Sequence, residues 1–177
     1  EGDMVVDPMC GSGTTIDVAK ELKRKVIGYD INPVRDDIIK NDSRTIPLKD
    51  DSVDFIFIDS PYSNNIKYSD SPLCIGKISC EKEEFYVELE KVAREIFRIL
   101  KPNKIMAWVI ADQWIKKKFT ATGFLLWQKL VKYFEPVEIV CLTRNNQTSN
   151  TPLWHERARM FNFYLRGFKY LFIMKKV

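Results

Sequence analysis

Two hydrophobic periodicities alternate along the 177 residues of the chain. Short runs rich in apolar and β-branched residues predict buried strands, and apolar residues three or four positions apart predict helices. The expected strands lie near 4–6, 26–29, 45–46, 53–58, 105–110, 137–142 and 170–174. The expected helices lie at 13–22, in a short piece opened by Asn32-Pro33, at 81–100 and near 120–133.

The segment 81–100 has the clearest helical pattern. Its apolar residues recur every three to four positions, with charged residues between them: Phe85, Leu89, Val92, Ile96 and Leu100. Ser79 is expected to cap the first turn, and Lys101-Pro102-Asn103 is expected to end the helix.

Strands that alternate with helices are typical of βαβ units and of a mostly parallel sheet. The last two expected strands, 137–142 and 170–174, have no helical pattern between them and therefore predict an antiparallel hairpin. A chain of this length suffices for one core of two or three layers. We expect a single α/β domain over 1–177, with a doubly wound, mostly parallel, seven-stranded sheet and a C-terminal antiparallel hairpin.

Composition narrows the class of protein. No apolar run approaches the roughly 18 residues of a membrane span, and no signal-peptide pattern opens the chain. The four cysteines, at 10, 74, 80 and 141, form no CxxC pair, so we expect reduced thiols, no metal site and a cytoplasmic location. The start at Glu1-Gly2-Asp3 lacks an initiator methionine, which is typical of one piece of a longer protein.

Charge is distributed unevenly. The net charge is +4, but residues 113–177 contain 12 lysines and arginines against 3 acidic residues. A third of the chain this basic is typical of a surface that binds nucleic acid. A solubilising surface beside an acidic half is the alternative.

A glycine-rich segment, Asp7-Pro8-Met9-Cys10-Gly11-Ser12-Gly13-Thr14-Thr15, follows the first expected strand and opens the first helix. A backbone that turns sharply beside a ligand favours residues without a Cβ atom. Asp30 ends the second expected strand, where a carboxylate can accept hydrogen bonds from ribose hydroxyls. A solvated strand end or a helix cap is the alternative role of Asp30. The pattern predicts a site for a nucleotide-like cofactor.

A second segment, Asp59-Ser60-Pro61-Tyr62, directly follows the apolar run 53–58. It places a carboxylate, backbone carbonyls, a rigid turn and an aromatic face at one point. Alone, such a string is as typical of a tight turn with a half-buried tyrosine. Its position after the glycine-rich segment favours a functional site.

Together, the two segments resemble the cofactor and target-amine motifs of the S-adenosylmethionine-dependent amino-methyltransferases, which methylate adenine N6 or cytosine N4 in DNA. DPMCGSGTT is similar to that family's DPFxGxGT, with Met9 in place of the usual Phe, and the resemblance covers nearly the whole chain. It implies a Rossmann-like class I methyltransferase fold with S-adenosylmethionine as cofactor. The cofactor-binding residues that it implies are Asp7, Met9, Cys10, Gly11, Gly13, Thr14, Asp30, Ile31 and Asp42.

Three of these residues have distinct implied roles. By the resemblance, Asp7 orients the methionine end of the cofactor, Ile31 packs on the adenine, and Asp42 receives the adenine's amine. Nearby acidic and amide residues are alternatives to Asp42: Asn41, Asp50 and Asp51.

The resemblance makes Asp59, Ser60, Pro61 and Tyr62 the catalytic residues. An exocyclic amine on a base is a poor nucleophile because its lone pair is delocalised into the ring. Hydrogen bonds to the Asp59 carboxylate and the Ser60 carbonyl would localise that lone pair and stabilise the charge that develops on nitrogen. Pro61 would stiffen the turn, and Tyr62 would stack on a base flipped out of a duplex.

The segment 59–62 identifies the reaction, methyl transfer to an amine, better than it identifies which base carries that amine. DPPY is common in adenine-N6 enzymes, SPPY in cytosine-N4 enzymes and NPPY in protein-glutamine methyltransferases, whereas this chain has DSPY. Guanine-N2 tRNA enzymes also use DPPY, so an RNA guanine-N2 methyltransferase is one alternative. A non-catalytic, nucleic-acid-binding subunit is another, although the intact Asp59 and Tyr62 argue against it.

Two segments, 63–80 and 143–168, are expected to form target-contacting loops. The first directly follows the catalytic motif and could close over the base, and in the second amides, aromatics and arginines interleave. A polar loop packed on its own aromatics is the alternative for 143–168. His155 is expected to be a surface or packing residue. Further recognition elements are expected in a preceding segment or another subunit, and a restriction-modification role stays one of several. The expected nucleic-acid contacts are Asn64, Lys67, Arg144, Asn146, Trp154, Arg157 and Arg166.

Overall fold

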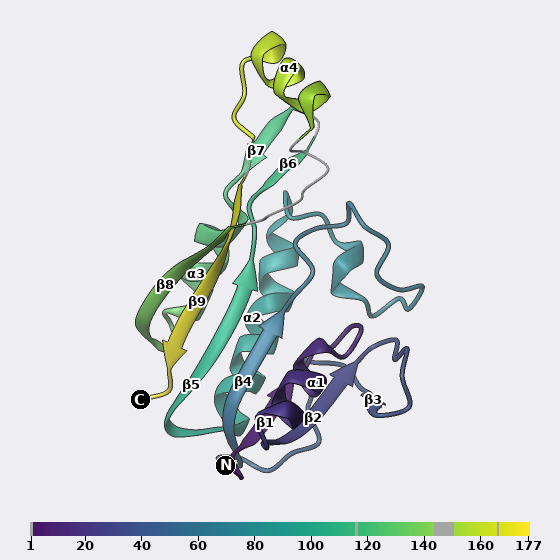
Figure 1. Cartoon of the computed structure of the whole chain (residues 1–177). Helices are drawn as coiled ribbons and strands as arrows, with labels where there is room; N and C mark the ends of the chain where they lie inside the picture. Colours follow the sequence, from purple (N-terminus) through teal and green to yellow (C-terminus); the bar gives the residue numbers. More distant parts are fainter. Residues whose placement is uncertain (1, 116, 144–150, 166) are drawn as a thin grey trace.

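One mixed sheet organises the chain in the computed structural model, which describes residues 2–115, 117–143, 151–165 and 167–177 (Figure 1). Its strand order is β3-β2-β1-β4-β5-β9-β8. The strands are β1 (Met4–Asp7), β2 (Lys25–Asp30), β3 (Ile38–Lys40), β4 (Val53–Asp59), β5 (Leu100–Ile110), β8 (Glu135–Thr143) and β9 (Phe168–Lys175).

Strand direction confirms the expected doubly wound sheet with a C-terminal antiparallel pair. Strands β1 to β5 are parallel, with β1 between β2 and β4. Strand β9 lies between β5 and β8 and is antiparallel to both. The chain order therefore reverses at β1 and β4, which is where doubly wound sheets bind ligands beyond the carboxyl ends of their strands.

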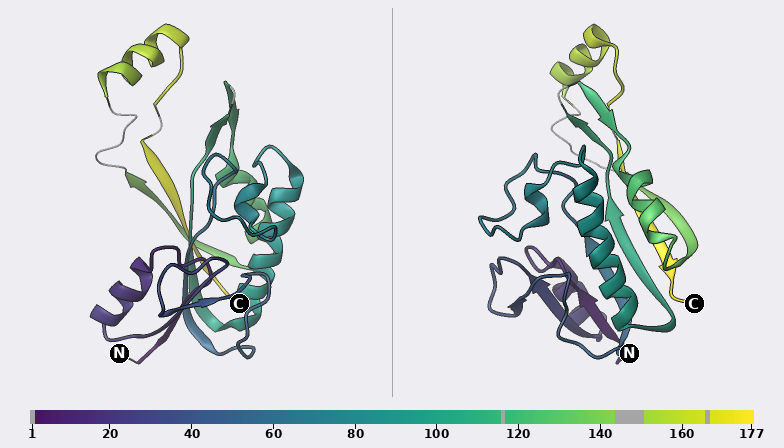
Figure 2. Two further views of the ribbon diagram at one scale, coloured as in Figure 1. Left: turned by 90° about the vertical axis from the view of Figure 1, so that its right-hand side faces the viewer. Right: turned by 180° about the vertical axis from the view of Figure 1, so that it is seen from behind.

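Helices cover both faces of the sheet. They are α1 (Thr14–Glu21), α2 (Glu83–Ile99), α3 (Thr122–Leu130) and α4 (Pro152–Phe161), with the short 3₁₀ turn η1 (Ile75–Lys77) before α2. Figure 2 shows α1 on one face of the sheet and α2 on the other. Helix α4 projects from the sheet beside the two-stranded hairpin of β6 (Gln113–Ile115) and β7 (Lys118–Thr120).

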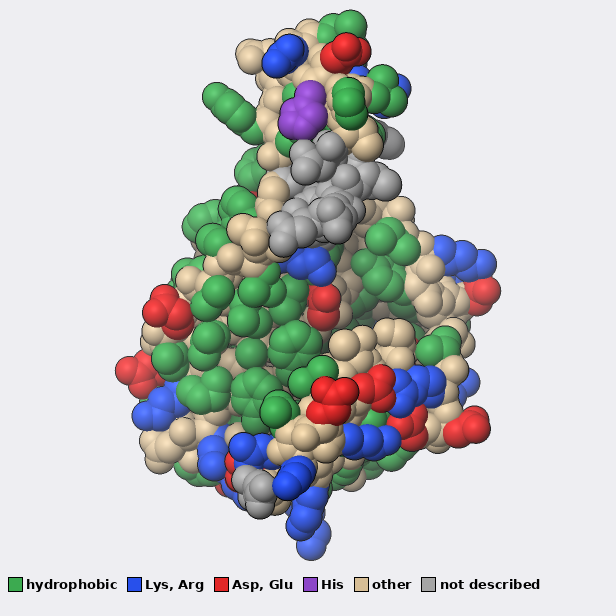
Figure 3. Space-filling model, in the orientation of Figure 1, with side chains coloured by type: hydrophobic (Ala, Val, Ile, Leu, Met, Phe, Trp, Pro, Cys, Tyr) green, Lys and Arg blue, Asp and Glu red, His purple; other side chains and the backbone are tan. Residues whose placement is uncertain are grey.

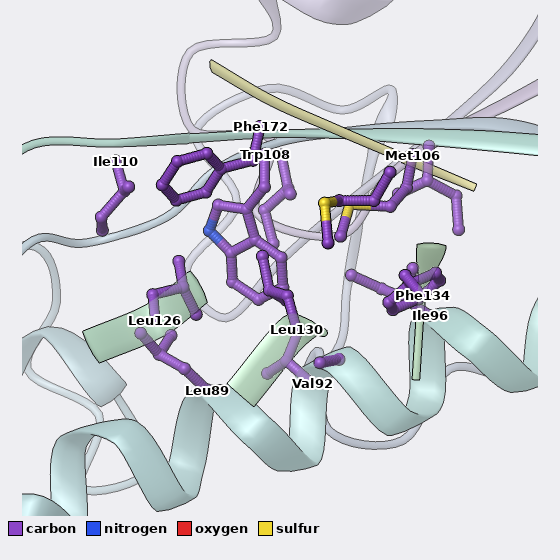
Figure 4. Packing of buried hydrophobic residues seen from close by; sticks show 14 of the residues in the cluster. Leu89, Val92, Ile96, Met106, Trp108, Ile110, Leu126, Leu130, Phe134 and Phe172 are labelled. Carbon is purple, nitrogen blue, oxygen red and sulfur yellow. The ribbon is translucent and has the colours of Figure 1, made fainter. Parts of the chain in front are cut away.

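The core lies between the sheet and helices α2 and α3. Trp108 on β5 is fully buried among side chains from both helices and from β9 (Figure 4). The expected apolar face of α2 is confirmed, because Phe85, Leu89, Val92 and Ile96 are fully buried. Burial of each such side chain contributes about 1.5–3 kcal/mol relative to its exposure. This core holds the carboxyl ends of β4 and β5 in a rigid frame.

The opposite face of the sheet is less well covered. Side chains of β8 are largely exposed, among them Val137, Ile139 and Val140, and Figure 3 shows a hydrophobic patch over β8 and β9. Among the described residues, no helix is long and apolar enough to cross a membrane.

The third strand lies at Ile38–Lys40, so the prediction near 45–46 was wrong. Ile46 is buried as expected, but side chains replace a strand partner for its backbone. Its N–H donates to Glu95 (2.6 Å), and its carbonyl accepts a bond from Arg98 (2.9 Å).

Two further local predictions were also wrong. The segment after Asn32-Pro33 forms bends and turns in place of a helix, and Asp30 accepts a bond from the Asn32 N–H at its start. Helix α2 begins at Glu83 with Lys82 at the N-cap, so Ser79 does not cap it. The Ser79 hydroxyl instead accepts a bond from the Glu81 N–H in the turn before the helix.

The two expected target-contacting loops contain regular structure. The segment 63–80 includes η1, and 143–168 includes α4. Thr151 precedes α4, and Pro152 occupies its first turn, where proline's fixed φ suits a helix. The hairpin of β6 and β7 was not expected at all. Arg144, Asn146 and Arg166 lie outside the described residues.

Candidate active site at the carboxyl edge of the sheet

Three carboxylates end three neighbouring parallel strands. Asp7 is the last residue of β1, Asp30 of β2 and Asp59 of β4. Because β1 pairs with both β2 and β4, their carboxyl ends lie side by side at one edge of the sheet. The sheet thus brings together the two segments that the sequence singled out.

The glycine-rich turn leaves β1 in a backbone conformation that favours glycine. Gly11 has φ +53° and Gly13 has φ +89°, and Gly13 is the N-cap of α1. A Cβ atom on Gly11 would have no heavy atom within 4 Å, so this position faces open space. A Cβ atom on Gly13 would lie 2.5 Å from the Arg35 guanidinium. The turn is therefore open on one side and closely packed on the other.

Asp30 holds the open side of this turn. Its two carboxylate oxygens accept bonds from the Gly11 N–H (2.9 Å) and the Asn32 N–H (2.8 Å). Each carboxylate oxygen can accept more than one hydrogen bond, so the side chain keeps acceptor capacity for a ligand's hydroxyls. The structure thus places Asp30 at the glycine turn, as a cofactor site requires.

Asp7 fixes the same turn from inside. It is 3% exposed and accepts bonds from the Met9 N–H (3.0 Å) and the Thr15 hydroxyl (2.5 Å). Burial raises the pKa of Asp7 to about 6, and the nearby carboxylates of Asp30 and Asp59 also raise it. The observed role of Asp7 is to lock the turn.

The remaining motif residues pack around the turn. Burial raises the pKa of the Cys10 thiol to about 12, so this side chain is a packing group without nucleophilic character. Met9 packs against the main core. Thr14 begins α1, with its hydroxyl 3.4 Å from that of Ser12. The four cysteines at 10, 74, 80 and 141 are unpaired with one another in the structure.

Arg35 is a site residue that the sequence analysis missed. Its guanidinium pairs with both Asp17 on α1 and Asp37, and it donates to the carbonyls of Ser12 (3.2 Å) and Gly13 (3.4 Å). These two carboxylates raise the pKa of Arg35 above its usual range. Arg35 thereby ties the glycine turn to the segment before β3. In the sequence, the basic residue followed by two acidic residues at 35–37 was the only indication of this ion pairing.

A cavity of about 470 Å³ lies at the two residues that follow β2 and its last residue, Asp30. It is lined by Ile31 and Asn32 on one side and by the segment 67–72 on the other. Ile31 therefore lies where a flat ring could pack on it. Lys67, expected to contact nucleic acid, lines this cavity and pairs with Asp70 (2.7 Å).

Asp42 is committed to an ion pair. Its carboxylate bonds the Arg44 guanidinium at 2.5 Å, and Arg44 also pairs with Glu88 on α2. Although partial burial opposes ionisation, hydrogen bonds from Arg44 lower the pKa of Asp42. A ligand amine at Asp42 would have to share this carboxylate with Arg44.

Asp59 and Tyr62 form the second half of the site. The Tyr62 hydroxyl donates to one Asp59 oxygen (2.5 Å), and Lys169 of β9 donates to the other (3.3 Å). The Lys169 ammonium also lies 5.1 Å from the centroid of the Tyr62 ring. Lys169 thus contacts both the carboxylate and the aromatic face, and the sequence analysis did not identify it.

Ser60 has a structural use for its side chain. It is 2% exposed, and its hydroxyl accepts a bond from the indole N–H of the fully buried Trp108 (2.9 Å). Pro61 packs beside Gly76 of η1, where a Cβ atom would lie 3.2 Å from the proline. The departure from DPPY at Ser60 therefore satisfies a buried donor in the core.

The other expected contacts are spread over two regions. Asn64 lies next to Ser63, whose hydroxyl is 3.3 Å from its side-chain oxygen. Trp154 and Arg157 of α4 line a second, larger cavity together with Tyr62. His155 is exposed on α4, as expected for a surface residue.

Comparison with known proteins supports the fold. A family model described as DNA methylase matches residues 1–41. A search of curated proteins found no significant match. The structure of TrmN from Thermus thermophilus has a TM-score of 0.63 and 18% identity, over 99% of this chain and 44% of that one. An S-adenosylmethionine-dependent methyltransferase from Methanosarcina mazei has a TM-score of 0.62 and 17% identity, over 100% of this chain and 93% of that one.

The cyclase SpnF is equally similar in fold. Its TM-score is 0.63 at 15% identity, over 99% of this chain and 75% of that one. The chain therefore has the class I methyltransferase fold, as the sequence led us to expect. Because a cyclase shares this fold, the reaction must be argued from the site.

Proposed function

We propose that this chain transfers a methyl group from S-adenosylmethionine to an exocyclic amino group of a nucleic-acid base, with adenine N6 or cytosine N4 in DNA as the target. The observation that carries the proposal is the convergence of two structures at one sheet edge. The glycine turn with Asp30 lies beside the Asp59–Tyr62 pair, on neighbouring strands.

The residues at the β1 and β2 ends fit the cofactor. The open space at Gly11 accommodates close approach of a ligand, and Asp30 keeps acceptor capacity for ribose hydroxyls. Ile31, in the otherwise largely polar lining of the cavity of about 470 Å³, is proposed to pack on the adenine ring. When bound, S-adenosylmethionine supplies an electrophilic methyl group on a sulfonium. We assign Asp7, Met9, Cys10, Gly13 and Thr14 to the shape of this pocket.

Asp59 is proposed to bind the target amine. A carboxylate that accepts a hydrogen bond from the amine localises the nitrogen lone pair and stabilises the positive charge that nitrogen gains during transfer. The Ser60 carbonyl is proposed to accept the second amine hydrogen. The Ser60 hydroxyl is committed to Trp108, so only its backbone is assigned to the reaction. Proton loss to Asp59 or water completes the reaction after transfer.

Lys169 lies where the target is proposed to bind. Its ammonium bonds Asp59 and lies over the Tyr62 ring, and these are the two contacts assigned to the amine and to its base. A cation left there would oppose positive charge on the nitrogen. We therefore propose that the incoming base displaces Lys169, and that Tyr62 then stacks on the base.

The choice of DNA over RNA is supported by the DNA methylase family model over residues 1–41. An RNA guanine-N2 target is the alternative, because the catalytic motif serves both. Incubation with radiolabelled S-adenosylmethionine and equal masses of unmethylated DNA and RNA would distinguish the two. We expect label in DNA with the wild type and none with Asp59→Ala. Label in RNA alone would replace the DNA proposal with the RNA alternative.

A further inference from the structure

A large groove opens from the catalytic motif toward the far end of the molecule. Its volume is about 1660 Å³, and it runs from Tyr62 between α4 and the β6–β7 hairpin. Figure 2 (left) shows that α4 and this hairpin both project from the same end of the sheet, apart from one another. We call it the aromatic groove, because its lining includes Trp114, Phe119, Trp154, Tyr164 and Phe168.

The aromatic groove exposes apolar side chains that a folded core would normally bury. Tyr164 is 98% exposed and Met160 is 74% exposed. Helix α4 buries none of its residues. Exposed apolar surface that is gathered in one groove marks a binding site.

Basic side chains lie over these rings. The Lys117 ammonium is 5.6 Å from the centroid of the Phe161 ring, and the Arg157 guanidinium is 5.2 Å from that of Trp154. The lining also includes two acidic residues, Asp112 and Glu156. The Asp112 carboxylate accepts bonds from the Gly123 N–H and the Tyr170 hydroxyl, both at 2.9 Å. Flat rings with cations beside them suit stacked bases and their phosphates.

The size and position of the groove point to a polymer. Its volume exceeds the roughly 300–1,000 Å³ typical of small-molecule sites. It begins at Tyr62, where the target base is proposed to stack, so nucleotides on either side of that base would enter it. The basic side chains of Lys117 and Arg157 in its lining suit contacts with the phosphates of such a polymer.

We propose that the aromatic groove binds an unpaired nucleic-acid strand, with the nucleotides flanking the target base stacked on its rings. This inference rests on the proposed function, since it takes the target base to lie at Tyr62. In a duplex, stacking between neighbouring base pairs covers the flat faces that such rings recognise, so unpaired strands bind more tightly than duplex. The β6–β7 hairpin and α4 act together as the two walls of the site.

The test is fluorescence anisotropy with a labelled single strand about 12 nucleotides long, with the same strand in a duplex, and with its RNA counterpart. We expect the single strand to bind about tenfold or more tightly than the duplex. Tyr164→Ala should weaken single-strand binding at least about fivefold, because stacking contributes about 1–3 kcal/mol per base. Because the Tyr164 side chain is almost fully exposed, its removal should leave the fold intact, so weaker binding would report the loss of stacking.

Two arginines of α4 offer a matched control. Arg157 lines the groove, whereas Arg159 is exposed on the same helix and is not among its lining residues. We expect Arg157→Ala to weaken single-strand binding clearly more than Arg159→Ala. Equal effects, or tighter binding of the duplex, would overturn the groove assignment.

Further outcomes separate this inference from the proposed reaction. In the Asp59→Ala background, which should lose methyl transfer, Tyr164→Ala should still weaken single-strand binding. If groove variants bind and methylate like the wild type, the groove proposal fails and the reaction stands. If the wild type binds strands through the groove but methylates no nucleic acid, the reaction fails and the groove stands. A dimer in sedimentation velocity that Tyr164→Ala dissociates would show that a second copy occupies the groove, and would overturn the proposal.

Discussion

The hydrogen bond between Trp108 and Ser60 gives a sharp test of how the catalytic turn is built. Ser60→Ala removes the acceptor of a fully buried indole N–H and adds no bulk. An unsatisfied buried donor costs about 1–3 kcal/mol. For a domain of this size, each kcal/mol lowers Tm by about 2–4 °C, so a loss of about 2 kcal/mol lowers it by about 4–8 °C.

Urea unfolding of the wild type, Ser60→Ala, Trp108→Phe and the double variant measures this coupling. We expect the double variant to lose less free energy of unfolding than the sum of the single losses, because it leaves no unpaired donor. Ser60→Ala should also retain most of its methyl transfer, since only the Ser60 carbonyl is assigned to the amine.

Two results would refute this reasoning. Wild-type stability in Ser60→Ala would show that the buried indole does not depend on this acceptor. Loss of methyl transfer to the level of Asp59→Ala, with the fold intact, would place the hydroxyl itself in the chemistry.

Further predictions concern the carboxylates and Lys169. Asp30→Ala should weaken S-adenosylmethionine binding about tenfold or more in calorimetry, because hydrogen bonds to a charged group contribute about 1.5–3 kcal/mol each. Asp36 is an exposed neighbour, and Asp36→Ala should leave the affinity unchanged. Equal affinities would remove Asp30 from the site. Asp7 has a folded pKa of about 6, above its usual 3.8, so its contribution to stability is full below pH 3.8 and is lost as pH rises through 6. Asp7→Asn should therefore gain stability relative to the wild type over that range, in unfolding curves taken at each pH; a pH-independent difference would contradict the raised pKa. Lys169→Ala removes the cation that competes with the target for Asp59. Because an exposed ion pair contributes about 0.2–1 kcal/mol, KM for the target should fall by up to about fivefold. A higher KM would show that Lys169 assists binding.

The buried strands and the main helix could be predicted because buried positions require apolar residues, which show in the sequence. The run 53–58 is apolar except for Asp54, since both faces of β4 are covered, and α2 shows the period of a helix with one buried face. The third strand could not be predicted. Ile46 looks like a strand residue, but Glu95 and Arg98, about fifty positions away, satisfy its backbone.

The site residues also divide into those that the sequence reveals and those that only tertiary contacts reveal. Asp30 and Asp59 could be predicted because each ends a strand beside a recognisable turn. Arg35 and Lys169 could not, since their importance depends on tertiary contacts across 18 and 110 positions. The β6–β7 hairpin was missed because its strands are only three residues long.

The central claim is transfer of a methyl group to a planar amine held by Asp59. Nucleoside digestion and mass spectrometry, after incubation with isotopically labelled S-adenosylmethionine, identifies the atom that receives the methyl. We predict labelled N6-methyladenine or N4-methylcytosine from DNA with the wild type, and at least about a hundredfold less with Asp59→Ala. Cofactor binding without label in any nucleoside, or equal label from Asp59→Ala, would contradict the account.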